Sequence, residues 1–309
     1  MIAKTFGALP LVAVAAFGTF ALASTAARAD SVVVVSPGNM GDWTFVNRDP
    51  SGTVTTPTTG QMVNGPASPP AGTGSANLNL PANNGGSDSA LRSTGFAGIA
   101  LDTLTTLQYS TYDTANNGSQ FPYFGLVVAA KGTVYDTVFF EPPYQQPSTG
   151  NPTLPDQGAP VQGQWQTWNA LAGAWWDNNG LSQPGNGPGH SLSFDELLAA
   201  IAAQASIDTN TVVTVADLTI ANTDDGSGNT LGGVRFDVGF ADPDPAYNGY
   251  VDAFKIGVNG TNTTYDFEAT AAATPLPAAL PMFGSALGFA GILGWHRKRK
   301  AAANAGARA

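Results

Sequence analysis

The sequence contains no cysteine and only two histidines, His190 and His296. Disulfide bonds, thiolate metal ligands and a cysteine nucleophile are therefore excluded, and a secreted chain of this kind must be held together by its own core. A Ser-His-Asp triad would rest on His190, which lies in the polar, glycine-rich segment GNGPGHSLS. These absences favour a protein that is not an enzyme.

Positive charge is also scarce, because 12 Lys and Arg residues face 22 Asp and Glu residues. All of the acidic residues lie between residues 30 and 274. That segment has five basic residues, which are Arg48, Arg92, Lys131, Arg235 and Lys255. Its formal charge is therefore −17, whereas the whole chain carries −10. An acidic surface repels phosphate backbones, so nucleic acid is not an expected partner.

The first 29 residues have the three parts of a secretory signal peptide. Lys4 supplies a positive charge, residues 6–22 are apolar, and Ala27 and Ala29 are small residues at the positions that signal peptidase reads. We expect cleavage before Asp30. The alternative is a membrane span, against which the cleavage site and the polar chain that follows both argue.

Residues 30–270 are rich in Gly, Pro, Asn, Thr and Ser, with short β-branched or aromatic runs between them. This pattern predicts an all-β fold, an antiparallel β-sandwich, with turns at Lys131-Gly132 and Asn259-Gly260. Residues 50–74 are predicted to be a long loop. The predicted strands lie within 31–36, 42–49, 75–81, 89–96, 103–113, 122–130, 132–142, 163–176, 211–224, 233–240 and 248–268.

One segment, residues 193–205, is predicted to form a short helix that covers an edge or an end of the sheets. Ser193 and Glu196 have the spacing of a capping box, and the acidic residues of the first turn complement the helix dipole. Leu197, Leu198 and Ile201 provide one apolar face.

The C-terminal stretch TPLPAALPMFGSALGFAGILGWHRKRK combines prolines, a short apolar run and a basic cluster. It resembles the PEP-CTERM class of bacterial sorting signals in its VPLPA-type variant. The matching residues are Thr274, where the variant usually has Val, Pro275, Leu276, Pro277 and Ala278, followed by the basic residues Arg297, Lys298, Arg299 and Lys300. A tail, residues 301–309, follows the cluster.

The resemblance implies that residues 274–300 are recognised by an exosortase-type protease. Residues 280–295 would form a transient transmembrane helix in the inner membrane, and the basic cluster, residues 296–300, would stay cytoplasmic. The apolar run is at the short end for a bilayer of about 30 Å. The alternative is an ordinary C-terminal anchor that is retained.

A second resemblance concerns residues 30–270, which we call the body of the protein. The segments GDWTF and GYVDAFKIGV are similar to the opening and closing strands of galactose-binding-like jelly-roll domains, and Asp252 matches the acidic residue of the closing strand. This implies a jelly-roll-like arrangement of the sandwich.

Carbohydrate binding requires aromatic faces for sugar rings and polar groups for hydroxyls. The segment WQTWNALAGAWWDNNG, residues 165–180, supplies both. Trp165, Trp168, Trp175 and Trp176 are therefore candidate ligand-binding residues, and adjacent tryptophans on a strand point to opposite faces. The alternative is that these tryptophans fill the core.

Acidic turns raise the separate question of a structural Ca²⁺, which takes six to eight oxygen ligands. The candidate ligands are Asp224, Asp225, Asp242, Asp244 and Asp252. None of these segments has the EF-hand spacing, and the same residues can cap their own turns. We expect no other cofactor.

The sequence thus predicts an exported, non-enzymatic protein with a structural or adhesive role at the cell surface or in the extracellular matrix. The alternative function is a module that binds extracellular polysaccharide, such as the exopolysaccharide of a biofilm. A secreted glycoside hydrolase ranks third, because only Glu141, Glu196 and Glu268 are glutamates and no paired acidic cleft is evident.

Overall fold

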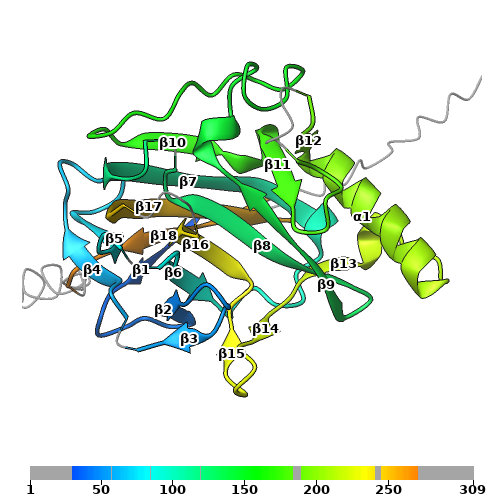
Figure 1. The fold of residues 1–309 in the computed structure, drawn as a ribbon, viewed down its shortest axis with the longest axis horizontal. Coiled ribbons are helices and arrows are strands. Elements are labelled where there is room, and N and C mark those ends of the chain that lie inside the picture. The colour runs from blue at the N-terminus through cyan, green and yellow to red at the C-terminus, as the bar shows by residue number, and fades with distance from the viewer. Residues whose placement is uncertain are drawn as a thin grey trace, which may run out of the picture.

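The computed structural model describes residues 30–56, 58–83, 85–118, 120–183, 189–240 and 245–270. They form a mostly-β fold with antiparallel sheets and one α-helix, which confirms the predicted fold class at this level (Figure 1). Within these ranges, no helix has the length and apolar character needed to cross a membrane.

Several predictions fall outside the described residues. These are the signal peptide with Ala27 and Ala29, the sorting motif from Thr274 to Ala278, the apolar and basic segments that follow, and the acidic residues Asp242 and Asp244. Asp30, the first described residue, is exposed and forms an ion pair of 2.9 Å with Lys255.

The first sheet has seven strands and is built around one long strand, β17. One edge of β17 pairs with β5 and then with β18, and its other edge pairs with β7. The strands are β1 (Ser31–Val35), β4 (Gln61–Asn64), β5 (Gly74–Leu80), β7 (Leu104–Ala115), β10 (Gln166–Asn169), β17 (Tyr247–Val258) and β18 (Thr261–Phe267). The β1–β18 pair is parallel, which departs from the predicted antiparallel arrangement.

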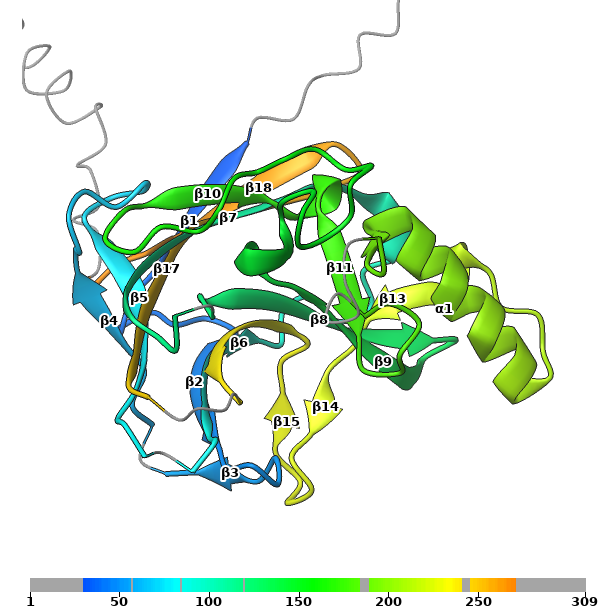
Figure 2. The same ribbon diagram turned by 45° about the horizontal axis from the view of Figure 1, so that its top comes forward.

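The second sheet has nine strands and curls around, as Figure 2 shows. Along its main path the order is β12-β11-β9-β8-β16-β6-β2-β3, and β13 also pairs with β8. The strands are β2 (Trp43–Arg48), β3 (Val54–Thr55), β6 (Asp88–Ser93), β8 (Tyr123–Ala130), β9 (Thr133–Phe140), β11 (Ala174–Asp177), β12 (Leu192–Ser193), β13 (Leu218–Ile220) and β16 (Val234–Gly239). A separate hairpin pairs β14 (Thr223–Asp224) with β15 (Thr230–Leu231).

The core lies between the two sheets and is rich in aromatic rings. Phe236 of β16 and Phe254 of β17 meet edge to face with centroids 5.2 Å apart. Trp43 of β2 contacts the same Phe254 ring at 5.9 Å. Phe236 and Phe254 are fully buried, and Trp43 is nearly so. Aromatic pairs of this geometry add to the gain from burial, so they hold the sheets face to face.

The predicted helix is confirmed as α1 (Phe194–Thr209), although it ends four residues later than expected. Both hydrogen bonds of the capping box between Ser193 and Glu196 are present. Phe194 packs against Trp175 of β11 at 5.0 Å, so the helix covers one end of the nine-stranded sheet. It ends at Asn210, which has left-handed φ of 51°.

Both predicted hairpin turns are confirmed. Lys131 and Gly132 join β8 to β9, and Asn259 and Gly260 join β17 to β18, with positive φ at all four residues. The prediction of a long loop over residues 50–74 is wrong in part. That stretch contains β3 and β4, and β4 is stabilised by pairing with β5 and by burial of Met62.

Candidate ligand-binding site

The candidate site lies on the outer face of the nine-stranded sheet, which is the face turned away from the seven-stranded sheet. Alternation along β16 explains how it arises, because Phe236 points into the core while Arg235 and Asp237 point outward. On the neighbouring strand β6, Asp88 and Arg92 lie on the same face. Arg48 of β2 is directly opposite Asp88.

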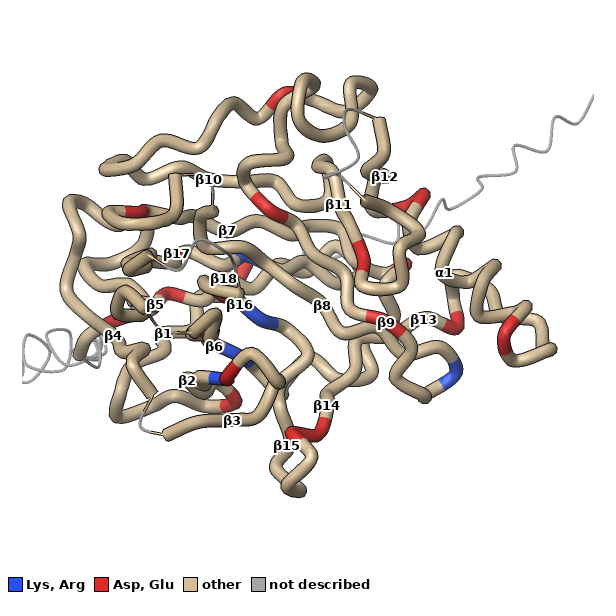
Figure 3. The backbone as a smooth tube through the Cα atoms, in the orientation of Figure 1, with Lys and Arg blue, Asp and Glu red and all other residues tan. Residues whose placement is uncertain are grey.

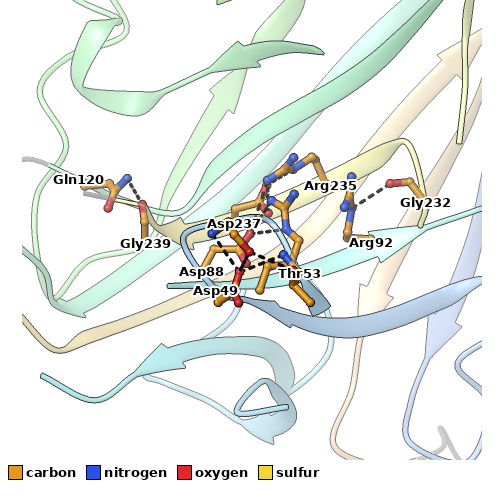
Figure 4. A network of polar contacts seen from close by, with 11 residues as sticks. Asp49, Thr53, Asp88, Arg92, Gln120, Gly232, Arg235, Asp237 and Gly239 are labelled. Carbon is orange, nitrogen blue, oxygen red and sulfur yellow. Dashed lines mark hydrogen bonds and ion pairs between the residues drawn. The ribbon is translucent and has the colours of Figure 1, made fainter. Parts of the chain in front are cut away.

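These five residues, Arg48, Asp88, Arg92, Arg235 and Asp237, form the arginine cluster. Figure 4 labels four of them, Asp88, Arg92, Arg235 and Asp237. Arg48 donates to Asp88 Oδ2 through Nη2 at 2.6 Å and through Nε at 3.1 Å. Arg235 is held in bidentate fashion by Asp237, with Nη2 2.7 Å from Oδ1 and Nε bonded to Oδ2. Its Nη2 also lies 3.6 Å from Asp88 Oδ2, which links the two pairs.

Two buried polar atoms of the cluster have no hydrogen-bond partner among the described residues. They are Oδ1 of Asp88 and Nη1 of Arg92, whose Nε donates to the Gly232 carbonyl at 2.9 Å. Burial is the main cause that raises the pKa of Asp88, to about 6, and the Asp237 charge adds to it, while Arg48 and Arg235 act in the opposite direction. Unpaired buried polar groups cost stability, so they mark a position where the fold alone does not explain the residue types.

Beside the cluster is a pocket of about 340 Å³. Its lining residues come from β2, β8, β9, β11 and β16 and from the ends of these strands. They are Arg48, Gln120, Tyr123, Phe139, Glu141, Trp176, Asn178, Arg235, Gly239 and Phe240. The volume lies at the lower end of the range of small-molecule sites, about 300–1,000 Å³.

Aromatic rings form one wall of the pocket. Trp176 stacks on Phe139 with centroids 4.3 Å apart and an interplanar angle of 24°. The guanidinium of Arg235 lies over the same Phe139 ring, 5.5 Å from its centroid. Gly125 allows this approach, because a Cβ there would lie 3.0 Å from Arg235 Cγ and 3.2 Å from Phe139 Cδ1.

A further aromatic residue, Phe240, borders the pocket directly after β16. Phe240 is 40% exposed, and the guanidinium of Arg48 lies 4.9 Å from its ring centroid. The preceding Gly239 carbonyl accepts a hydrogen bond of 2.7 Å from Gln120 Nε2, as Figure 4 shows. The buried Oε1 of Gln120 has no hydrogen-bond partner within the described part of the chain.

Glu141 is the carboxyl group among the described residues of the lining. It follows β9 directly, before Pro142. Burial raises the pKa of Glu141 to about 7, and the neighbouring Trp176 indole partly offsets this rise. The two side chains do not form a hydrogen bond of standard geometry, because Trp176 Nε1 is buried and has no hydrogen-bond partner among the residues described. In the described structure the pocket thus has one donor, Trp176 Nε1, and one acceptor, Gln120 Oε1, without a hydrogen-bond partner.

The four candidate tryptophans divide between the core and the surface. Trp168 and Trp175 are fully buried, with indole N–H groups bonded to Thr111 Oγ1 and to the Ala170 carbonyl, so they offer no face to a ligand. Trp165 is half-buried and donates to the Pro66 carbonyl at 2.9 Å. Trp176 lines the pocket. Adjacent tryptophans were expected on opposite faces, and the structure places Trp175 in the core and Trp176 at the pocket.

Of the candidate calcium ligands, the three that are described, Asp224, Asp225 and Asp252, do not form a metal site. Asp224 and Asp225 accept hydrogen bonds from backbone N–H groups of their own turn, at Gly226 and Ser227. Asp252 is buried in β17 and accepts from Ala71 N and Phe267 N. Across the described ranges, no group of three or more acidic or histidine residues is placed to hold a metal ion.

Most of the pocket was missed by sequence reasoning. From the sequence, Glu141 is only one of three glutamates, and the arginines contribute only to the charge of the chain. A usable signal was present in VRFDV, because Arg235 and Asp237 alternate there with apolar residues in a strand whose neighbours are buried. Charged residues at every second position of an apolar strand indicate a polar outer face.

No protein-family model matches the chain, and the search of curated proteins gave no match. Among solved structures, the protein is similar at low level to a beta-1,2-glucanase from Parabacteroides distasonis, with 10% identity and a TM-score of 0.29. The match covers 70% of this chain and 22% of the glucanase chain. At that TM-score the likeness supports neither a shared fold nor a shared activity.

Proposed function

We propose that residues 30–270 form a non-enzymatic carbohydrate-binding domain, and that the pocket beside the arginine cluster holds a saccharide. The observation that carries this proposal is the stacked pair of Trp176 and Phe139 in the wall of a pocket of about 340 Å³. An aromatic face packs against the C–H face of a sugar ring, and nearby polar groups hydrogen-bond its hydroxyls. Glu141, Asn178 and Gln120 supply those groups.

The surrounding assignments belong to the same proposal. The protein is exported after cleavage by signal peptidase, is sorted by an exosortase-type protease through residues 274–300, and acts as an adhesive protein at the cell surface or in the extracellular matrix. Its two packed sheets are a jelly-roll-like sandwich. Mass spectrometry of the mature protein checks the sorting step, because a mature chain that retains residues 280–300 beside an active exosortase contradicts it.

Affinity electrophoresis of the full chain tests the binding site. Gels that contain bacterial exopolysaccharide should retard the wild type. The Trp176→Ala variant should bind about thirtyfold more weakly, since a buried aromatic contact typically contributes about 2 kcal/mol. Trp165→Ala is the matched control, because Trp165 packs on Tyr112 and does not line the pocket. Absence of retardation, or equal retardation of wild type and Trp176→Ala, would refute the site.

The same samples distinguish binding from hydrolysis. Glycoside hydrolysis requires two carboxyl groups in most families, and Glu141 is the carboxyl of the described lining. We therefore expect no release of reducing ends from the polysaccharide. Release that is abolished by Glu141→Gln would replace the binding assignment with a glycosidase, in which Glu141 acts as the acid.

A further inference from the structure

The positive charges of the body are concentrated at this one site. Residues 30–274 contain five basic residues, and three of them, Arg48, Arg92 and Arg235, belong to the arginine cluster. They lie on the adjacent strands β2, β6 and β16, and Figure 3 shows blue segments of the tube at these strands. Lys131 lies in the β8–β9 turn, and Lys255 forms its ion pair with Asp30 on the other sheet. On a body with a formal charge of −17, this concentration requires an explanation.

The cluster is also unbalanced. Three guanidinium groups face two carboxylates, Asp88 and Asp237, so the cluster has a formal excess of one positive charge. Arg92 and Arg235 are Cα partners in the β6–β16 ladder, and like charges that are directly opposite destabilise a sheet. Burial and the nearby Arg235 charge both lower the pKa of Arg92, in agreement with that repulsion. The cluster therefore contains buried positive charge that is not fully balanced by its two carboxylates.

Two of the three arginines line the pocket, and neither of the two carboxylates does. Arg48 and Arg235 are lining residues, whereas Asp88 and Asp237 are not. A ligand in the pocket would thus meet the cationic side of each ion pair. A carboxylate suits planar guanidinium groups, which bind it with paired N–H donors.

We propose that the pocket selects saccharides that carry a carboxylate, namely uronic acid residues of an acidic polysaccharide, and that Arg48 and Arg235 face this carboxylate. The inference rests on the proposed carbohydrate-binding function and adds the class of ligand. It also explains why the excess charge is retained, since the ligand would supply the missing negative charge.

The titratable groups around the pocket predict how binding depends on pH. Arg48 lines it from β2, Arg235 from β16, Tyr123 from β8 and Glu141 from the end of β9. Behind the two arginines lie Asp237 of β16 and Asp88 and Arg92 of β6. Burial raises the pKa of Glu141 to about 7 and that of Asp88 to about 6, and it keeps Tyr123 neutral. Protonation of the two acids makes the site more positive. Binding of a uronate, which stays ionised at pH 5.5, should therefore strengthen from pH 8 to pH 5.5.

Affinity electrophoresis of the full chain against matched polysaccharides tests the inference. The probes are polygalacturonate, alginate and a glucuronate polymer, each with its carboxyl-reduced counterpart, and dextran sulfate. We expect the acidic member of at least one pair to bind about tenfold or more tightly than its reduced form. Arg48→Gln should remove that preference and Arg48→Lys should retain part of it. Lys131→Gln, a charge change in the β8–β9 turn, is the matched control.

Each outcome decides between the two proposals. Equal binding of acidic and reduced forms overturns the carboxylate inference and leaves carbohydrate binding intact. Preference for dextran sulfate overturns the assignment to a carboxylate. Loss of binding to all probes and to exopolysaccharide overturns both. Nonspecific attraction is a poor explanation for a positive result, because a body of charge −17 repels polyanions, and higher salt reduces that repulsion.

Discussion

Asp88 should make the protein less stable at neutral pH than at acidic pH. Its pKa rises from 3.8 to about 6 on folding, mainly through burial. The folded protein is therefore about 3 kcal/mol more stable with Asp88 protonated than with Asp88 ionised. The folded state holds the proton more tightly than the unfolded state does. The stabilising contribution is therefore complete below about pH 4, and it is lost as the pH rises from about 4 to about 6.

The assay is urea unfolding of the wild type and Asp88→Asn at pH 4.5 and pH 7.5. In the unfolded chain the Asp88 carboxyl is already partly ionised at pH 4.5. We therefore expect the contribution of Asp88 to the free energy of unfolding to differ by about 2 kcal/mol between pH 4.5 and pH 7.5. When the pH is lowered from 7.5 to 4.5, the free energy of unfolding of the wild type should increase by that amount relative to that of Asp88→Asn. The comparison removes the contributions of the other acidic residues, which both proteins share.

Asp102→Asn, at an exposed carboxyl outside the cluster, is the control for the effect of an Asp-to-Asn substitution itself. Parallel profiles for the wild type and Asp88→Asn would refute the reasoning, as would a wild type that gains stability relative to the variant when the pH is raised. Either result would mean that Arg48 and Arg235 hold Asp88 ionised and that the two ion pairs outweigh burial.

Two further predictions concern stability. Ser193→Ala should cost about 1 kcal/mol in urea unfolding, because it removes the side-chain cap of α1, and an unchanged midpoint would contradict the cap. Trp175→Ala should cost about 3–5 kcal/mol, because the ring is fully buried against Phe140 and Phe194, whereas Trp176→Ala at the pocket should cost clearly less. Equal losses for the two tryptophans would contradict their assignment to opposite faces of β11.

The extent to which the fold could be predicted differs between elements. The capping box of α1 and the Asn259-Gly260 turn are local signals, because the residues that interact are three positions apart or adjacent, so they were predicted correctly. The strand β4 was not predicted, because its segment Gln61–Asn64 has no strong alternation of apolar and polar residues. It becomes a strand because β5 is available as a partner.

The candidate site was harder to predict, because it is assembled across strands. Arg48, Asp88, Arg235 and Glu141 are distributed over almost 190 residues of sequence, and only the strand order β9-β8-β16-β6-β2 brings them to one face. Strand order is a non-local property that alternation does not reveal. Trp176 was identified from the chain because its relation to Trp175 depends only on the two-residue period of a strand.

The parallel pairing of β1 with β18 has a consequence for how the chain completes its fold. Ser31 pairs with Thr263 and Val35 with Phe267. The first of the described strands, β1, therefore cannot pair until the last of them, β18, has been synthesised. More than 200 residues must emerge before the seven-stranded sheet can close, and contacts of such separation form slowly. Among the described strands β1 pairs with β18, so it remains an unpaired edge until residue 267 has been synthesised, and a chain truncated before Thr261 cannot bury Val35 in this way. The seven-stranded sheet therefore closes only when the chain from Ser31 to Phe267 is present in full.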